Sequence, residues 1–239
     1  CASSAGEPLT PEVVGWAADA LGVEVRDHYG QTELGMVVGN AWRPELQADV
    51  TPGSMGHPLP GWSCGVLADD VDEVVPDGTV GRLAVDTWAG PFMWFTGYAN
   101  APERTAQRFS ADGRWYITGD TAYRDSDGRL YFSSRDDDVI IMAGYRIGPF
   151  DVESVLVGHA AGLEAAAIGA PDELRGEVLE AYVVLKPGTD ESPELEQELQ
   201  QLVKREFAAH AYPRRVHVVG ELPKTPSGKI QRFRLTEHL

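Results

Sequence analysis

The sequence SSRDDDVIIMAGYRIGPFDVES, residues 133–154, separates two parts of the chain that have different patterns. Before it, short alternating or apolar runs broken by Gly, Pro and Asp predict strands and turns, as in a small barrel or sandwich. After it, two apolar runs, a long helical pattern and a last apolar run predict an α+β unit of about 100 residues, an ordinary size for a domain. The three consecutive acids at 136–138 mark the boundary, so we expect domains at 1–136 and 137–239.

Three segments predict helices with recognisable ends. Residues 10–22, TPEVVGWAADALG, place Thr10 at a capping position, proline at the first helical position and glycine at the exit. Residues 192–210, SPELEQELQQLVKREFAAH, repeat apolar residues at helical spacing after a possible Ser192 cap. A third helix is expected to begin at Pro149. Two of these helices fall after the boundary, which favours the α+β prediction for that part.

The composition limits the class of partner. The 239 residues include 37 acidic and 20 basic side chains, for a net charge of −17. A surface this acidic repels phosphate backbones and anionic lipid, which argues against nucleic acid or a membrane as main partner. No run of about 18 apolar residues predicts a membrane span. Cys1 and Cys64 form no disulfide framework, so we expect a reducing, cytoplasmic location. Basic residues gather between 204 and 234, which indicates that this end meets a small anion.

Two motifs in the first part contain residue types that bind nucleotides. In YGQTE, residues 29–33, Thr32 offers a hydroxyl and an N–H to an anion, and Glu33 offers hard oxygen to Mg²⁺. In WYITGD, residues 115–120, Asp120 follows a glycine and is suited to accept two hydrogen bonds from a ribose diol. Taken alone, each motif is more typical of an ordinary turn.

The boundary stretch adds four candidate residues. Arg135 is placed to reach a second ribose oxygen or a phosphate. Asp137 lies between the two parts, where a hinge is expected. Gly144 and Arg146 lie in a turn before a helix, a suitable place to meet the arm and phosphates of a thiol substrate. The alternative is that the acids at 136–138 form a solvated linker.

Near the end of the given sequence stands LPKTPSGKIQRFRL, residues 222–235, in which prolines and a glycine predict a stiff loop with Lys229 at its tip. A lysine ammonium is a compact, mobile point charge. It suits a reaction in which a carboxylate attacks phosphorus and negative charge gathers on two groups of oxygens. An isolated SGK is more typical of an exposed tail lysine. The sequence contains no Walker loop, no H-E-x-x-H, no G-x-S-x-G and no zinc-spaced Cys/His cluster.

In their order and spacing, YGQTE, GSMGHPLPG, YITGD, SRDDDVIIMAGYRIGPFDVES and LPKTPSGKIQR resemble the second half of an adenylate-forming enzyme. That superfamily includes acyl-CoA synthetases, adenylation domains of peptide synthetases and luciferases. The resemblance covers essentially the whole chain. The phrase AGYRIGPFDVES is most similar to acetyl- and medium-chain acyl-CoA synthetases.

The resemblance implies a fold of mixed α/β and α+β class. Residues 1–136 would be the C-terminal part of the large AMP-binding domain, with a distorted β-barrel subdomain at about 46–136. Residues 137–239 would be the small, mobile C-terminal domain. The large domain continues upstream in this family, so we expect an N-terminal half in the same chain.

The resemblance also implies a role for each motif residue. Catalysis would rest on Lys229, Thr32 and Glu33, with Glu33 on Mg²⁺. The ATP/AMP-binding residues would be Tyr29, Gly30, Gln31, Thr32, Asp120 and Arg135. Asp137 would be the hinge. Gly144 and Arg146 would bind CoA after the small domain turns.

The implied activity is that of an AMP-forming acid–thiol ligase in fatty acid metabolism. It would activate a carboxylic acid, expected to be a medium-chain fatty acid, as acyl-adenylate with release of pyrophosphate and then transfer it to CoA. Two alternatives remain open: a ligase that loads a carrier protein's phosphopantetheine, and a non-catalytic half-protein that binds AMP or CoA. The family's Ser/Thr/Gly-rich phosphate loop is absent from this sequence, so we expect the isolated segment to be inactive in adenylation.

Overall fold

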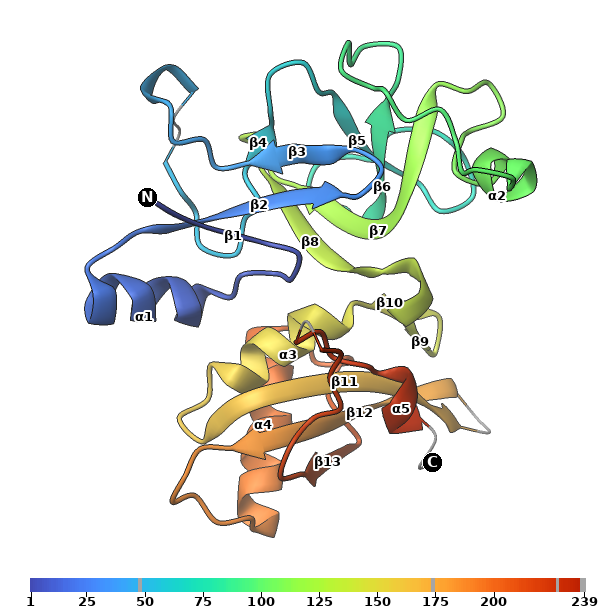
Figure 1. Cartoon of the computed structure of the whole chain (residues 1–239). Helices are drawn as coiled ribbons and strands as arrows, with labels where there is room; N and C mark the ends of the chain where they lie inside the picture. The colour runs from blue at the N-terminus through green and yellow to red at the C-terminus, as the bar shows by residue number, and fades with distance from the viewer. Residues whose placement is uncertain (47–48, 173–174, 227, 237–239) are drawn as a thin grey trace. The chain divides into compact units, whose positions relative to one another are not determined.

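The computed structural model describes the chain except for residues 47–48, 173–174, 227 and 237–239. Within the described residues the chain forms two compact units, Cys1–Asp136 and Asp137–Leu239 (Figure 1). Both units combine helices with β-sheets, so the predicted mixed α/β and α+β class is confirmed.

The first unit begins with a β–α–β segment. Strand β1 (Ala2–Ala5) pairs in parallel with β2 (Val25–Gln31), and helix α1 (Pro11–Leu21) makes the crossover between them. Pro11 stands at the first helical position and Gly22 ends the helix in the left-handed conformation, as the sequence predicts. Thr10 occupies the cap position, but its side chain makes no capping hydrogen bond. Parallel strands need such a crossover, because a two-residue turn reverses the chain and can join only antiparallel strands.

The same sheet continues through two antiparallel strands. Strand β3 (Gly35–Gly39) pairs with β2, and the short β4 (His57–Pro58) pairs with β3, which gives the order β1-β2-β3-β4. The 3₁₀ turn η1 (Pro44–Leu46) lies in the connection between β3 and β4. The hairpin between β2 and β3 carries the YGQTE motif, so its geometry decides how that motif is presented.

A second four-stranded antiparallel sheet completes the first unit. Its strands run in sequence order, β5 (Cys64–Leu67), β6 (Gly81–Asp86), β7 (Trp115–Arg124) and β8 (Leu130–Arg135). The five-residue helix α2 (Pro102–Ala106) precedes β7. Leu34, Val37 and Val38 from the β2–β3 hairpin share one buried core with Leu83, Tyr116 and Leu130 from the second sheet. The barrel was expected at about residues 46–136. There, β5–β8 form this open sheet and β4 belongs to the first sheet, so the described strands close no barrel.

The second unit is an open sheet with helices on it. The hairpin of β9 (Ile140–Met142) and β10 (Tyr145–Ile147) follows the 3₁₀ turn η2 (Asp136–Asp138). The long strands β11 (Gly162–Asp172) and β12 (Gly176–Leu185) pair antiparallel, and β13 (Arg215–Val218) pairs in parallel with β12. Strand β9 joins the same sheet through β12.

Both faces of this second sheet are covered. Helices α3 (Pro149–Val157) and α4 (Pro193–Glu206) contribute Val152, Leu156, Leu199 and Val203 to one buried cluster. The C-terminal segment, with α5 (Phe233–Thr236), contributes Leu222 and Leu235 to a cluster on alternate residues of β11 and β12. The predicted Ser192 cap is confirmed, because its hydroxyl accepts a hydrogen bond from the Leu195 N–H at 3.1 Å. Pro149 opens α3, as the sequence predicts.

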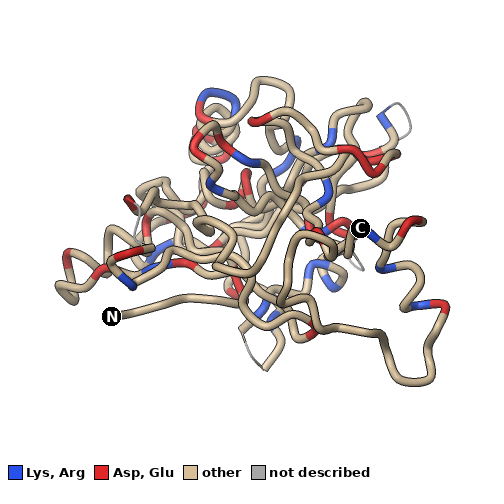
Figure 2. The backbone as a smooth tube through the Cα atoms, turned by 90° about the horizontal axis from the view of Figure 1, so that it is seen from above, with Lys and Arg blue, Asp and Glu red and all other residues tan. Residues whose placement is uncertain are grey.

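No helix in the described part of the chain is long and apolar enough to cross a membrane. Acidic and basic residues are spread along the whole backbone rather than gathered in one block (Figure 2).

Candidate active site

The hairpin between β2 and β3 presents Thr32 and Glu33 at its tip. A β-bulge falls between Tyr29 and Gly30, and a Cβ on Gly30 would lie 2.2 Å from the carbonyl oxygen of Gly35. Gly35 itself has a φ of +73°, in the left-handed region that favours glycine. Two glycines thus allow a tight turn that leaves Thr32 exposed and Glu33 half-buried.

Glu33 is held as an ionised carboxylate by a residue that sequence reasoning missed. The Tyr98 hydroxyl donates to Glu33 Oε1 at 2.6 Å, and the Arg104 guanidinium lies 4.2 Å from the centre of the Tyr98 ring. The Tyr98 hydrogen bond, supported by the charges of Arg108 and Arg104, lowers the pKa of Glu33. Tyr98 lies 65 residues further along the chain, so no local pattern links it to YGQTE.

The carboxylate of Glu33 is suited to be one protein ligand of a divalent cation. Hard carboxylate oxygen is what Mg²⁺ prefers, and Mg²⁺ usually keeps one or two protein carboxylates plus substrate phosphates and water. Within the residues that the structure describes, no group of three or more His, Cys, Asp or Glu side chains could hold a metal ion. Glu33 is thus a candidate for the single protein carboxylate of such a site.

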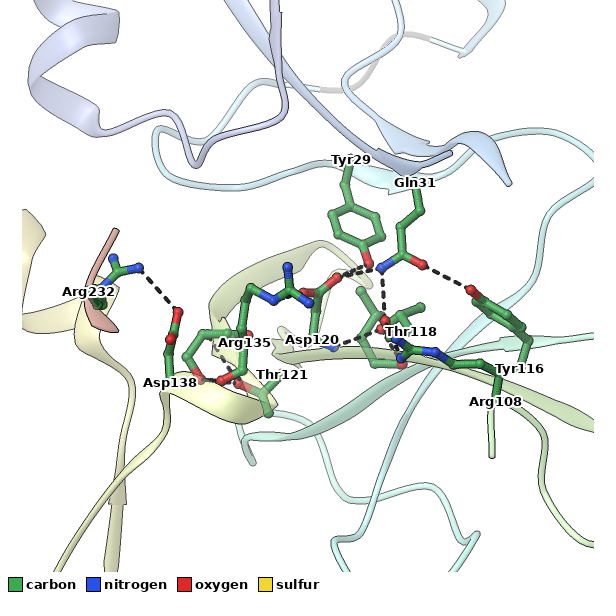
Figure 3. Close-up of polar contacts among 12 residues, drawn as sticks. Tyr29, Gln31, Arg108, Tyr116, Thr118, Asp120, Thr121, Arg135, Asp138 and Arg232 are labelled. Carbon is green, nitrogen blue, oxygen red and sulfur yellow. Dashed lines mark hydrogen bonds and ion pairs between the residues drawn. The ribbon is translucent and has the colours of Figure 1, made fainter. Parts of the chain in front are cut away.

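Asp120 is the centre of a buried polar cluster that joins β2 to β7 (Figure 3). The Tyr29 hydroxyl and the Gln31 amide, from alternate residues of β2, both donate to Asp120 Oδ2, the amide at 2.8 Å. The Gln31 amide also donates to the Thr118 carbonyl at 2.9 Å. Asp120 is only 6% exposed, and this burial raises its pKa, while the bond from Tyr29 and the charge of Arg135 act in the opposite direction.

Arg135 lies beside Asp120 because of strand register. The two residues are directly paired partners on the antiparallel strands β8 and β7. Arg135 Nε is 4.0 Å from Asp120 Oδ1, the oxygen that Tyr29 and Gln31 do not use, and the Arg135 side chain is 56% exposed. Gly119, the residue before Asp120, has a φ of +78°, and a Cβ at this position would lie 2.6 Å from Arg108 Nη1. Glycine therefore leaves room for the Arg108 guanidinium beside the strand. An oxygen next to an exposed cation is an arrangement that can accept a ligand hydroxyl.

The candidates in the second unit lie on three segments: the turn η2, the β9–β10 hairpin and the loop that carries Lys229. Gly144 and Ala143 have positive φ angles of 84° and 50° in the two-residue turn between β9 and β10, as the favoured hairpin turns require. Arg146 lies on β10 and is exposed. Asp137 is exposed in η2 and is the first residue of the second unit.

Lys229 lies on the third segment, a loop whose two arms are hydrogen-bonded to each other. The Lys229 N–H donates to Thr225 Oγ1 at 3.0 Å, and the Thr225 N–H donates to the Lys229 carbonyl at 2.8 Å. The side chain of Lys229 is exposed. Most other cations of the basic stretch have partners in the same unit, such as Lys224 with Glu164 at 2.7 Å. The stretch is therefore less of an anion-binding surface than its composition suggests.

The structure thus gathers the candidates into two groups. The first unit brings together Tyr29, Gly30, Gln31, Thr32, Glu33, Asp120 and Arg135. The second unit holds Asp137, Gly144, Arg146 and Lys229, on three segments. Tyr98 and Thr118 complete the first group, and their roles follow from contacts that only the folded sheets create.

Comparison with known proteins finds one matching family model within each unit. The model of the AMP-binding enzyme family matches residues 1–98, and the model of the AMP-binding enzyme C-terminal domain matches residues 151–229. Acyl-coenzyme A synthetase ACSM3 of Rattus norvegicus, a mitochondrial protein, is 41% identical over 235 residues, which cover 97% of this chain and 39% of that protein. Acetyl-coenzyme A synthetase of Bacillus subtilis is 42% identical over 231 residues, which cover 96% of this chain and 39% of that protein.

Solved structures of larger proteins also match nearly the whole of this chain. The crystal structure of ATP-bound MatB from Rhodopseudomonas palustris matches 99% of this chain with a TM-score of 0.87 at 30% identity, and the match covers 44% of that chain. The present chain therefore spans about two fifths of the length of the proteins that it matches.

Proposed function

Because this chain belongs to the AMP-binding enzyme family, we propose that it is part of an ATP-dependent acyl-CoA synthetase. The full-length protein would convert a carboxylic acid, ATP and CoA into acyl-CoA, AMP and pyrophosphate. A medium-chain fatty acid is the substrate to test first, because AGYRIGPFDVES resembles the synthetases of that class. The observation that carries the proposal is the pairing of Asp120 with Arg135, next to the turn that presents Thr32 and Glu33.

In the first half-reaction a carboxylate oxygen of the acid attacks the α-phosphorus of ATP, and the bond to pyrophosphate breaks. Asp120 and Arg135 would hold the ribose, because the oxygen of Asp120 that faces Arg135 can accept from a ribose hydroxyl. Thr32 would donate to the α-phosphate. Mg²⁺, when bound, would neutralise phosphate charge, and Glu33 is the residue suited to hold it.

Lys229 would supply the positive charge where the acid and the α-phosphate meet. Two anions approach each other in this step, so a mobile ammonium between them lowers the barrier. The structure supports this assignment by placing Lys229 exposed on a loop that is closed by its own backbone hydrogen bonds.

In the second half-reaction the CoA thiol attacks the acyl carbonyl, AMP leaves and the thiol proton is released. Gly144 and Arg146 would then face the site, with Asp137 as the hinge. Asp137 is the first residue of the second unit, which supports a hinge at this point. Presenting two faces of one domain in turn is a known form of gating.

The test uses the full-length protein and separates the two half-reactions. In Lys229→Ala we expect ATP–pyrophosphate exchange to fall roughly 100- to 1000-fold, as when one stabilising group of a transition state is removed. Thioester formation from preformed acyl-adenylate and CoA should stay near the wild-type rate. Equal losses in both half-reactions, or no loss in exchange, would contradict the proposal.

A further inference from the structure

The loop that carries Lys229 is closed by its own hydrogen bonds. We call residues 223–226 and 228–231 the lysine hairpin. Besides the two bonds between Thr225 and Lys229, the Gln231 N–H donates to the Pro223 carbonyl at 2.8 Å, and Lys224 forms an antiparallel bridge with Ile230. Because these bonds join the two arms of the hairpin, the direction in which Lys229 points depends on what holds its base.

Arg232 lies at that base and binds two other segments of the unit. Its Nη2 donates to Glu153 Oε2 at 2.7 Å and its Nε donates to Glu153 Oε1 at 3.0 Å, a bidentate pair. Its Nη1 donates to Asp138 Oδ2 at 3.2 Å (Figure 3). One guanidinium thus joins the lysine hairpin to helix α3 and to the turn η2, directly after the hinge candidate Asp137.

Glu153 gives this anchor a fixed geometry. It is 6% exposed, and its Oε1 also accepts the Ala167 N–H of β11 at 2.8 Å. Burial raises the pKa of Glu153, while Arg232 and the Ala167 N–H act against the shift. Because the arginine guanidinium is planar, two parallel hydrogen bonds to one carboxylate fix the orientation of the guanidinium as well as its distance.

The other contacts of this segment fix its direction less well. Leu222, Ile230 and Leu235 pack on one face of the sheet, and apolar contact has no preferred direction. Lys224 pairs with Glu164 at 2.7 Å, but both side chains are more than a third exposed, and exposed ion pairs contribute little stabilising free energy. Among these side-chain contacts in the described part of the segment, the bidentate pair of Arg232 with Glu153 is the one with a fixed direction.

We propose that Arg232 is a positioning residue for the adenylation half-reaction: its bidentate bond to Glu153, with its third arm on Asp138, holds the lysine hairpin at the angle that Lys229 requires. The inference rests on the proposed role of Lys229. It predicts that loss of Arg232 affects adenylation and spares thioester formation, because Gly144 and Arg146 lie on a different hairpin of the same unit.

The experiment measures both half-reactions of Arg232→Gln in the full-length protein. We expect pyrophosphate exchange to fall about 10- to 100-fold, as a misplacement of about 1 Å does, with little change in the KM for ATP. Thioester formation from preformed acyl-adenylate should stay within about twofold, which also shows that the unit is folded. The matched control is Arg234→Gln, an exposed arginine of the same segment, in which both rates should stay at wild-type values.

A double variant separates positioning from a structural role. If Arg232 acts through Lys229, then Arg232→Gln added to Lys229→Ala lowers exchange no further, because groups that act as a unit are not additive. A further loss in the double variant, or a parallel loss of both half-reactions in Arg232→Gln, overturns the inference. Should Arg232→Gln fail to fold, Arg232→Lys keeps the charge but cannot form the bidentate pair. A loss of pyrophosphate exchange without a loss of thioester formation in that variant then supports the inference, and a parallel loss overturns it.

The two ideas fail in different ways. If Lys229→Ala itself shows no split between half-reactions, the proposed function is wrong. If Lys229→Ala shows the split and neither Arg232→Gln nor Arg232→Lys does, only the inference about Arg232 is wrong.

Discussion

Asp120 in the first unit and Glu153 in the second are two buried carboxylates with the same exposure, 6%, and different surroundings. Burial raises the pKa of both, and an arginine acts against the shift in both. Glu153 meets its arginine in two bonds of 2.7 and 3.0 Å, and the Arg232 side chain is 22% exposed. Asp120 lies 4.0 Å from an arginine that is 56% exposed.

The difference distinguishes a structural ion pair from the candidate binding arrangement. Both oxygens of Glu153 are bonded within the protein, so it has little left to offer a ligand. Asp120 directs both of its side-chain hydrogen bonds to Oδ2 and leaves Oδ1 beside an exposed cation. Burial and a shifted pKa alone would have given the two residues the same role; the partner geometry distinguishes them.

The largest effect is expected for the structural pair. In Glu153→Gln the Arg232 guanidinium loses its buried counter-charge, and removing one partner of such a pair costs about 3 kcal/mol or more. We expect the opening free energy of α3 and β11 to fall by about that amount, measured by amide hydrogen exchange in the full-length protein. The control is Glu164→Gln, which removes an exposed pair with Lys224 and should cost less than about 1 kcal/mol. Similar losses in both variants would contradict the comparison.

Asp120→Asn should instead affect ligand binding. A hydrogen bond to a charged group contributes about 1.5–3 kcal/mol, so we expect the KM for ATP to rise roughly 10- to 100-fold. Protection of the small unit against exchange should not change, since Asp120 belongs to the other unit. Asp127→Asn, an exposed acid in the turn after β7, is the matched control and should leave the KM at its wild-type value. An unchanged KM in Asp120→Asn would remove the binding role.

The sequence predicted the elements better than their contacts. The helix after Ser192 and the start of α3 at Pro149 follow from caps and periodicity, which act within a few residues. The open sheet of β5–β8, found where a barrel was expected, depends on pairing between distant strands, which local patterns do not specify.

The same limit applies to the site. YGQTE identified Thr32 and Glu33 as candidates because a short loop motif suffices to suggest them. Tyr98 and the pairing of Arg232 with Glu153 were missed, because each joins residues at least 65 positions apart. Asp120 and Arg135 were both candidates from the sequence, and only strand register showed that they are direct neighbours. The roles of these residues remain predictions until the half-reactions are measured.

Asp27 extends the comparison to a buried carboxylate without an arginine. It is 6% exposed and accepts the N–H groups of His28 at 2.9 Å and Leu9 at 3.5 Å, while its neighbour Arg26 is paired with Glu24. Burial raises the pKa of Asp27 from 3.8 to about 6, and the two backbone bonds only partly oppose the shift. The folded state therefore holds this proton more tightly than the unfolded state does.

The sign of the pH effect follows from that difference. A carboxyl with a raised folded-state pKa gives stability that is complete below its unfolded pKa and is lost as the pH rises through the folded pKa. Wild type should thus lose about 1 kcal/mol between about pH 5 and about pH 7 relative to Asp27→Asn, which cannot ionise. Denaturant midpoints of both proteins at the two pH values measure this, with Asp19→Asn on the exposed side of α1 as control. If the stability difference between wild type and Asp27→Asn does not grow with pH, burial alone does not raise the pKa of a carboxyl in this protein. The arginines beside Asp120 and Glu153 would then have a smaller pKa shift to oppose than the comparison assumes.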